Sequence, residues 1–303
     1  MKYELIIIRY GEISLKREET RRRFESTLVN NIKNALDAKQ IPNTVKKERG
    51  RIYVYTSKIE ESIPILTNVF GIVSVSPAIQ TKTDINSISK LSLDISKNLL
   101  NETKSFAVRA TRTGKHDFTS QDIAVKIGSD VVKATKARVN LTKPDFEIFI
   151  EIRNDKTYLF TEKIRGVGGL PLGTQGKVIS LIIDKKSLLA AWYLMHRGCK
   201  AIFIKTKKTK EKIEPFFSKW NIKPEIITIK TQDKDLYKNL NQLALEYNCD
   251  ALVTNYNIDK NSLDLLSEIK SLKQHMDIPV LHPLIAMDEK TINKKCKDIG
   301  LKS

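Results

Sequence analysis

Apolar and polar positions divide the chain into three stretches, and the first stretch mixes strand and helix periods. "YELIIIRYG" (3–11) is a nearly continuous apolar run closed by glycine, which predicts a buried strand. Residues 16–40 predict a helix, because apolar side chains recur at helical spacing at Phe24, Leu28, Ile32, Ala35 and Leu36. Two further predicted strands, at 51–57 and 71–79, flank a predicted helix at 59–69. This order is typical of a small split βαβ sandwich.

The second stretch repeats this mixture and ends in a glycine-rich segment. Residues 86–101 and 119–137 predict helices, with the strand "SFAVRATRTG" (105–114) between them. "FEIFIEIRND" and "KTYLFTEKIRG" predict a hairpin that turns at Asn154 and Asp155. The segment "GVGGLPLGTQGK" (166–177) contains five glycines and one proline, which predicts a linker.

The third stretch alternates short apolar runs with helical periods. The runs are "VISLII", "AIFIKT", "EIITIK", "ALVTNY" and "PVLHPL". Strands that alternate with helices predict a parallel, doubly wound sheet. The predicted fold class is therefore α/β, with two small mixed domains before a parallel-sheet domain.

The net charge points to a polyanionic partner. The 303 residues include 53 Lys+Arg and 35 Asp+Glu, so the formal charge is 53 − 35 = +18. Nucleic acid is the first candidate. An anionic membrane is the second, but no basic amphipathic helix accompanies an acylation signal, and no apolar run approaches the roughly 20 residues of a membrane span. A lysine-rich, solvated surface is the alternative without a partner.

Cysteine and histidine positions give no metal pattern. Cys199, Cys249 and Cys296 lie far apart without a CxxC pair, and His196 and His282 are isolated. The first residues lead straight into a strand-like run without a signal-peptide pattern. The expectation is a cytoplasmic protein without a metal and without a membrane partner.

Residues after the strand at 105–114 form a candidate nucleic-acid surface. Cations, a ring, a hydroxyl and a predicted helix start combine at Arg109, Arg112, Lys115, His116, Phe118 and Ser120. Cations and a helix N-terminus suit a sugar–phosphate chain, and the ring could stack on an unpaired base. The alternative is that Phe118 belongs to the core and the cations are ordinary surface residues.

A second candidate site lies in "GKVISLIIDKKSLLAAWYLMHRGC" (176–199), which predicts a strand, a loop and a helix. Phosphate loops use small residues, because backbone N–H groups must close on the anion. The loop here is glycine-free and consists of Ile183, Asp184, Lys185, Lys186 and Ser187. Asp184 would place negative charge beside a phosphate, whereas the two lysines would attract an anion without a cradle.

Several stretches resemble the tRNA 4-thiouridine synthase family, sulfurtransferases also tied to thiamine thiazole synthesis. "RYGEISLKREETRRRFESTL" resembles the start of that family, and residues 108–132 resemble the core of a THUMP domain. "RGVGGLPLGTQGKVISLI" and "IPVLHPLIAMDEKTINKKCKDIG" resemble its linker and C-terminal region. The resemblance spans nearly the whole chain in the same order.

The resemblance implies three domains and a tRNA substrate. They are a ferredoxin-like domain at 1–60, a THUMP domain at 61–165 and, after a linker at 166–177, a PP-loop-type adenylation domain at 178–303. The first two would hold tRNA, and the third would use ATP and Mg²⁺ before a cysteine persulfide delivers sulfur. The residues expected to bind RNA are Lys16, Arg21, Arg22, Arg109, Arg112, Lys115, His116, Phe118 and Ser120.

The third domain departs from the family pattern at its chemical positions. The family carries SGGxDS where this chain has "IDKKS", and a glycine-rich stretch where this chain has "TNYNIDKNSLDL" (254–265). His282 replaces a family arginine. The family's later relay cysteine is not expected in this chain, and Cys199 and Cys296 are interpreted as structural.

These departures lead to a main hypothesis and two alternatives. The main hypothesis is a degenerate, tRNA-binding relative that needs no cofactor, has no catalytic residue and keeps 183–187 as a vestigial loop. Its partners would be tRNA and a separate catalytic or sulfur-carrier protein, and the resemblance adds a homodimer. One alternative is an active sulfurtransferase with an atypical ATP and Mg²⁺ site. The other is a thiamine-pathway protein that takes a small substrate.

Overall fold

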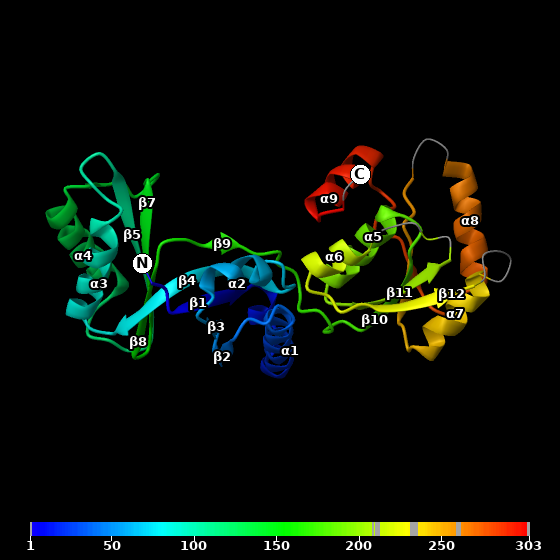
Figure 1. Ribbon diagram of the computed structural model, residues 1–303, viewed down its shortest axis with the longest axis horizontal. Helices are drawn as coiled ribbons and strands as arrows, with labels where there is room; N and C mark the ends of the chain where they lie inside the picture. Colours follow the sequence, from blue (N-terminus) through cyan, green and yellow to red (C-terminus); the bar gives the residue numbers. More distant parts are fainter. Residues whose placement is uncertain (1, 208, 210–212, 231–235, 259–261, 302–303) are drawn as a thin grey trace. The chain divides into compact units, whose positions relative to one another are not determined.

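The computed structural model describes residues 2–207, 209, 213–230, 236–258 and 262–301. The chain divides into two compact units, each built from segments that are distant in sequence. Unit 1 comprises Met1–Arg9, Gln40–Pro64 and Ser74–Arg165. Unit 2 comprises Tyr10–Lys39, Ile65–Val73 and Gly166–Ser303. Figure 1 gives the element labels used below.

The first sheet has nine strands in the order β2-β3-β1-β4-β8-β7-β5-β6, with β9 paired to β4. The strands are β1 (Leu5–Tyr10), β2 (Thr44–Glu48), β3 (Arg51–Tyr55), β4 (Ile72–Lys82), β5 (Ser105–Thr113), β6 (Arg138–Val139), β7 (Phe146–Arg153), β8 (Lys156–Phe160) and β9 (Ile164–Arg165). The helical elements of this part of the chain are η1 (Glu12–Leu15), α1 (Glu18–Asp37), α2 (Ile59–Leu66), α3 (Ile85–Lys97) and α4 (Ser120–Thr135).

Strand alternation gives β7 two different faces. Ile148, Ile150 and Ile152 are buried against the apolar sides of α3 and α4, which lie next to each other in Figure 1. Phe149 points to the opposite face, where it packs in a cluster with Tyr53 and other side chains of β1, β3 and β8. Polar side chains of β7 that point to the same face as Phe149 therefore lie among side chains of other strands, and no helix among the described residues covers them.

The second sheet is parallel, with the order β12-β11-β10-β13-β14. Its strands are β10 (Lys177–Leu181), β11 (Lys200–Thr206), β12 (Glu225–Ile229), β13 (Ala251–Val253) and β14 (Val280–Leu281). Its helices are α5 (Lys185–His196), α6 (Glu214–Lys219), α7 (Leu236–Glu246), α8 (Ser262–Gln274) and α9 (Glu289–Asp298).

Helices cover both faces of this second sheet, as a doubly wound domain requires. Val178 and Phe203 pack in one cluster with α5, α6 and α9, whereas Ile179 and Ile204 pack with α7 and α8 on the other face. The strand order reverses beside β10, whose neighbours are β11 and β13. In open α/β sheets, ligands bind at the carboxyl ends of the strands at this reversal.

The glycine-rich segment 166–177 is held by backbone hydrogen bonds within unit 2. Gly168 O accepts from Gly71 N at 2.7 Å, and Gly173 N donates to Gly198 O at 2.8 Å. Gly169 has φ +77°, and a Cβ there would lie 2.2 Å from His196 O. Only glycine fits at this position, where the backbone of residue 169 lies against the backbone of His196. The domain boundaries proposed from the sequence, including a linker here, stay predictions.

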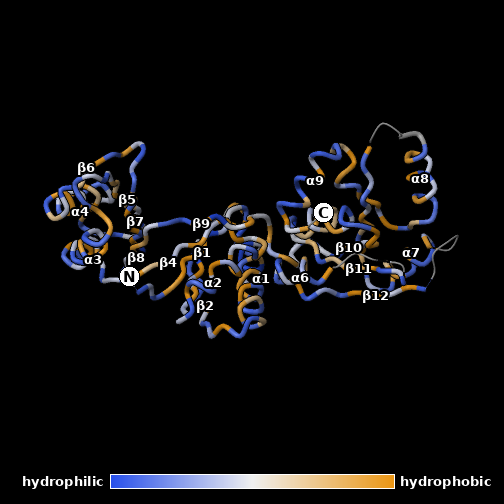
Figure 2. Tube along the Cα trace, turned by 45° about the horizontal axis from the view of Figure 1, so that its top comes forward, coloured by the Kyte–Doolittle hydropathy of each residue, from blue (hydrophilic) through white to orange (hydrophobic). Residues whose placement is uncertain are grey.

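The structure confirms the predicted fold class, with a mixed sheet followed by a parallel doubly wound sheet. Along α1, hydrophobic and hydrophilic positions alternate in Figure 2, as the spacing of its apolar residues predicts. The sequence did not reveal β2, because four of its five residues, "TVKKE", are polar and none is buried. Its strand conformation comes from pairing with β3, a long-range effect that local composition does not carry.

Candidate nucleic-acid surface and nucleotide loop

The turn between β5 and α4, taken with Arg112 at the end of β5 and Ser120 at the start of α4, carries five of the six RNA-binding candidates in unit 1. His116 Nε2 lies 2.7 Å from Asn154 O, which fixes this turn to the tip of the β7–β8 hairpin. Gly114 has φ +105° and leaves room for the Asn154 side chain. The turn is thus a defined shape on the protein surface, although it contains no regular secondary structure.

The cations of this turn keep their charge available. Arg112 Nη1 donates to Gly114 O at 3.1 Å and lies 3.3 Å from His116 Nδ1, and no carboxylate within the described ranges pairs with it. Lys115 is exposed and likewise forms no ion pair with any described residue. A surface depression of about 530 Å³ is lined by Lys82, Thr83, Asp84, Lys115, His116, Asn154 and Asp155.

Phe118 and Ser120 complete the turn and begin α4. The Phe118 ring stacks on His116 with 5.4 Å between centroids, and it also packs partly against the core under α3 and α4. Ser120 is the first residue of α4, and Thr119 caps this helix in a reciprocal box with Asp122. Hydrogen bonds from Thr119 hold the pKa of the Asp122 carboxyl below its ordinary value.

Arg109 lies apart from this turn and has structural partners. Its Nε is 2.8 Å from Glu147 Oε1, and its Nη2 donates to Leu141 O at 2.6 Å. The side chain thereby joins β5 to β7 and to the loop before β7. Of the candidates in unit 1, Arg109 is the one most committed to the fold.

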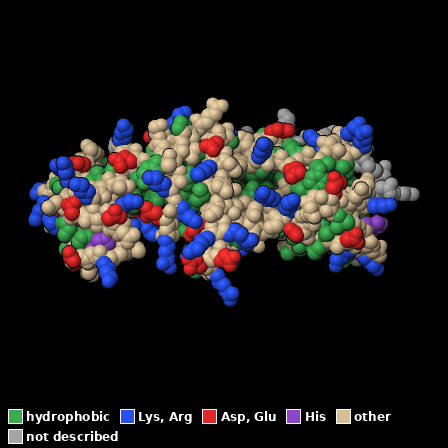
Figure 3. Space-filling view, turned by 90° about the horizontal axis from the view of Figure 1, so that it is seen from below, with side chains coloured by type: hydrophobic (Ala, Val, Ile, Leu, Met, Phe, Trp, Pro, Cys, Tyr) green, Lys and Arg blue, Asp and Glu red, His purple; other side chains and the backbone are tan. Residues whose placement is uncertain are grey.

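The remaining candidates, Lys16, Arg21 and Arg22, belong to unit 2. Lys16 follows η1 and is exposed, Arg22 pairs with Glu18, and Arg21 lies 3.9 Å from Glu25. Figure 3 shows Lys and Arg side chains spread over the face in view and mixed with carboxylates. On this face, the positive charges therefore do not gather into one patch.

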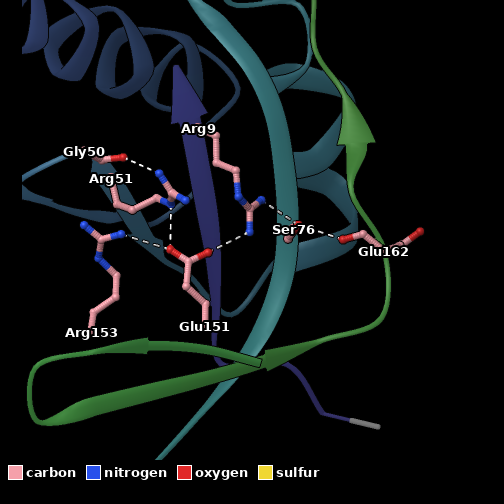
Figure 4. A network of polar contacts seen from close by, with 7 residues as sticks. All are labelled: Arg9, Gly50, Arg51, Ser76, Glu151, Arg153 and Glu162. Atoms are coloured by element: carbon pink, nitrogen blue, oxygen red, sulfur yellow. Dashed lines mark hydrogen bonds and ion pairs between the residues drawn. The ribbon is translucent and has the colours of Figure 1, made fainter. Parts of the chain in front are cut away.

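Sequence reasoning missed a buried ionic cluster in unit 1. Glu151 forms ion pairs with three arginines: Arg9 at 3.2 Å, Arg51 at 2.7 Å and Arg153 at 3.2 Å (Figure 4). Arg9 also donates to Ser76 Oγ, so the cluster joins β1, β3, β4 and β7. Burial alone would raise the pKa of Glu151, but Arg51 and Arg9 hold it below its ordinary value.

The loop Ile183–Ser187 is closed by its own side chains. Asp184 is the N-cap of α5, and its Oδ1 accepts from Ser187 N at 3.0 Å and Ser187 Oγ at 3.1 Å. The same Oδ1 accepts from Asn255 Nδ2 at 3.0 Å. Ser187 Oγ in turn accepts from Ile183 N at 3.1 Å. The Asp184 carboxylate therefore occupies the N-terminal end of α5.

Lys186 is held by a carboxylate at the same edge of the sheet. Its Nζ forms an ion pair with Glu289 and lies 3.2 Å from Asn257 Oδ1. Beside it is a depression of about 340 Å³ lined by Ile183, Asp184, Lys186, Asn255, Tyr256, Asn257 and Leu265. This depression lies between the loops after β10 and β13, where a doubly wound sheet binds its ligand.

This arrangement does not fit the phosphates of a nucleotide. The N–H groups at the start of a phosphate-binding helix must point at the anion, but here Ser187 N points at the Asp184 carboxylate. A phosphate would meet that carboxylate at close range, and Lys186 would have to leave Glu289 to neutralise it. In this structure, the loop forms the N-cap of α5 rather than a phosphate-binding site.

The segment 254–265 adds two further polar contacts to this edge, although Asp259–Asn261 lie outside the described residues. Thr254 Oγ1 is 2.6 Å from His282 Nδ1, and Tyr256 Oη donates to Glu268 at 2.6 Å. Burial lowers the pKa of His282, so its imidazole is neutral over a wider pH range than that of an exposed histidine.

The cysteines are buried thiols. Burial raises the pKa of Cys199 and of Cys249, which disfavours the nucleophilic thiolate. Cys296 is also buried. Within the described ranges, no group of three or more His, Cys, Asp or Glu side chains could hold a metal ion, and no helix is long and apolar enough to cross a bilayer.

Sequence profiles match three consecutive regions and define the class of protein. They describe the ThiI ferredoxin-like domain at 5–76, the THUMP domain at 82–162 and the thiamine biosynthesis protein ThiI at 221–303. The loop 183–187 lies outside the third match. By its fold, the chain is a protein of the ferredoxin-like, THUMP and PP-loop type.

Relatives that match almost the whole chain identify the family. A probable tRNA sulfurtransferase from Methanobrevibacter smithii is 35% identical over 99% of this chain and 87% of its own length. One from Thermococcus kodakarensis is 32% identical over 98% of this chain and 88% of its own length. The chain therefore belongs to the tRNA sulfurtransferase family.

Solved structures agree with this fold. PH1313 from Pyrococcus horikoshii is 32% identical, with a TM-score of 0.84 over 98% of this chain and all of that chain. A 4-thiouridine synthetase, solved with RNA and ATP, has a TM-score of 0.82 at 24% identity over 99% of this chain and 85% of that chain.

These comparisons favour the active sulfurtransferase over the degenerate relative, because the relatives that match almost the whole chain are named tRNA sulfurtransferases. The expectation that the chain needs no cofactor gains no support from them. The atypical contacts of Asp184 and Lys186 are features of this chain's own structure.

Proposed function

We propose that this protein binds tRNA and acts in tRNA thiolation. The observation that carries the proposal is its relation, over almost its full length, to proteins named tRNA sulfurtransferase. A THUMP domain match and the RNA complex of a structurally similar 4-thiouridine synthetase support tRNA as the substrate.

The turn between β5 and α4 is proposed as part of the tRNA surface. Arg112 and Lys115 are cations without a carboxylate partner within the described ranges, so neither must break an ion pair to meet a phosphate. His116 and Phe118 add rings beside them. Cations that contact phosphates, next to rings, suit a strand with unpaired bases.

In the first form of this function, the chain carries out sulfur transfer itself. The family relation favours this form. It requires Asp184 to leave the start of α5, because its carboxylate lies where a phosphate would meet the helix N–H groups.

In the second form, the chain holds tRNA for a separate catalytic or sulfur-carrier protein. The closed loop favours this form, since Asp184 and Lys186 already have partners. The raised pKa of the Cys199 thiol also favours it, because a persulfide carrier needs a reactive thiolate.

One assay separates the two forms. The full chain is incubated with a tRNA transcript, Mg-ATP and sulfide as sulfur donor, and thiolated tRNA is detected by its retardation in a mercury-containing gel. Product formed only with Mg-ATP supports the first form. Bound but unmodified tRNA supports the second, and absence of tRNA binding contradicts both.

A further inference from the structure

We infer that the Asp184 carboxylate takes the place of a bound anion at the N-terminus of α5. In this position it excludes phosphate from that helix N-terminus. The inference concerns anion binding at α5 alone, and so holds whether or not the chain transfers sulfur. It rests on three contacts that converge on one carboxylate oxygen.

The first two contacts come from within the loop. Ser187 N and Ser187 Oγ both donate to Asp184 Oδ1, at 3.0 and 3.1 Å. A phosphate at a helix N-terminus receives the same kind of donor, a free N–H of the first turn. A carboxylate in this place satisfies the donor and also matches the positive end of the helix dipole.

The third contact comes from the loop after β13, on the other side of the crevice. Asn255 Nδ2 donates to the same Oδ1 at 3.0 Å, from 71 residues further along the chain. An ordinary N-cap needs no donor from a distant loop. The Asn255 amide therefore makes the Asp184 carboxylate part of the crevice between β10 and β13, where this type of sheet binds its ligand.

Lys186 provides the matching cation. Its Nζ pairs with Glu289 and lies close to Asn257 Oδ1, so the loop contains a carboxylate and an ammonium that both have internal partners. Here the protein's own side chains supply both charges.

A direct test measures binding of inorganic pyrophosphate by calorimetry to the wild-type chain and to Asp184→Ser. Serine is as good an N-cap as aspartate, so helix α5 should persist. Loss of the negative charge and of the longer side chain should raise pyrophosphate affinity by tenfold or more, because like charges a few ångströms apart repel strongly at a protein surface. The double variant Asp184→Ser, Lys186→Met should lose most of this gain.

Asp288→Ser is the matched control. Asp288 also caps a helix of unit 2, α9, and Thr291 N donates to it at 2.7 Å. Its removal changes the net charge equally and should leave affinity within about twofold. Folding of each variant is checked by circular dichroism. If Asp184→Ser binds no tighter than the wild-type chain, or if Asp288→Ser gains as much, Asp184 does not exclude the anion.

Discussion

Two turns of this protein have the same local structure, but they differ in whether their lysine is paired with a carboxylate. Each turn joins a strand to a helix, β5 to α4 and β10 to α5, and each helix begins with a reciprocal capping box. In the first turn, Lys115 is exposed and has no carboxylate partner among the described residues. In the second, Lys186 pairs with Glu289.

The comparison teaches that residue type alone does not make an anion site. Both turns offer lysine near a helix start, but only the first leaves the charge free to meet a phosphate. In the second, a carboxylate accepts from the helix N–H and from Asn255, so an incoming anion must displace internal bonds. Charge that is already neutralised contributes little to binding from solution.

The largest expected effect concerns the buried ionic cluster around Glu151 in unit 1. Glu151→Gln should lower the free energy of unfolding by about 3 kcal/mol or more, because removing one partner of a buried ion pair leaves the other charges uncompensated. Arg9, Arg51 and Arg153 would then face one another without the carboxylate. Urea unfolding measures this change.

Glu147→Gln is the control for that experiment. Its pair with Arg109 is more than one-third exposed on both side chains, so the cost should stay under about 1 kcal/mol. Equal costs for the two variants would contradict the assignment of Glu151 as the centre of the buried ionic cluster.

The pH dependence of stability gives a second test of Glu151. Its pKa is lower in the folded chain than the ordinary value of 4.5. The unfolded chain therefore takes up the proton first as pH falls, so this contribution is present above pH 4.5 and is lost as pH falls through the folded pKa. The acid loss should be smaller in Glu151→Gln, and an unchanged acid profile would contradict it.

The sequence predicted the two turns but not their partners. An apolar run followed by helical spacing predicted β10 and α5. Asp184 was predicted to place a negative charge beside a phosphate. Asn255 and Glu289 lie 71 and 103 residues from their partners, Asp184 and Lys186, and no local period reports such contacts. The three-arginine cluster around Glu151 was missed for the same reason, since its members come from strands far apart in sequence.

A smaller effect is expected at Lys186. Lys186→Met should reduce the stability of the chain by about 1 kcal/mol or less, because the Glu289 side chain is 44% exposed and water screens the pair. Affinity for tRNA should not change if the first turn carries the RNA surface. A clear loss of tRNA affinity with this variant would show that the second turn also binds tRNA, and would contradict the difference between the two turns.

The smallest effect is expected from His282, behind the second turn. Burial lowers its pKa in the folded chain, so the unfolded chain binds the proton more readily once pH falls below the ordinary value of 6.5. Stability should therefore decline between pH 7 and pH 5.5, and His282→Gln should reduce that decline. Thermal unfolding at several pH values measures it, and an equal decline in the variant would contradict the cause.

The central claim is that the turn between β5 and α4 binds tRNA. The direct measurement is the tRNA dissociation constant as a function of salt for the wild-type chain, for Arg112→Gln with Lys115→Gln, and for a control with Lys90→Gln and Lys97→Gln on α3. The test variant should bind at least about tenfold more weakly, and its slope of log affinity against log salt should be shallower by about 1.4, since each phosphate contact with a single strand releases about 0.7 counterion and two such contacts are lost. The control, which loses the same charge from the same unit, should keep the wild-type slope. Wild-type affinity and slope in the test variant, or equal losses in both variants, would contradict the account.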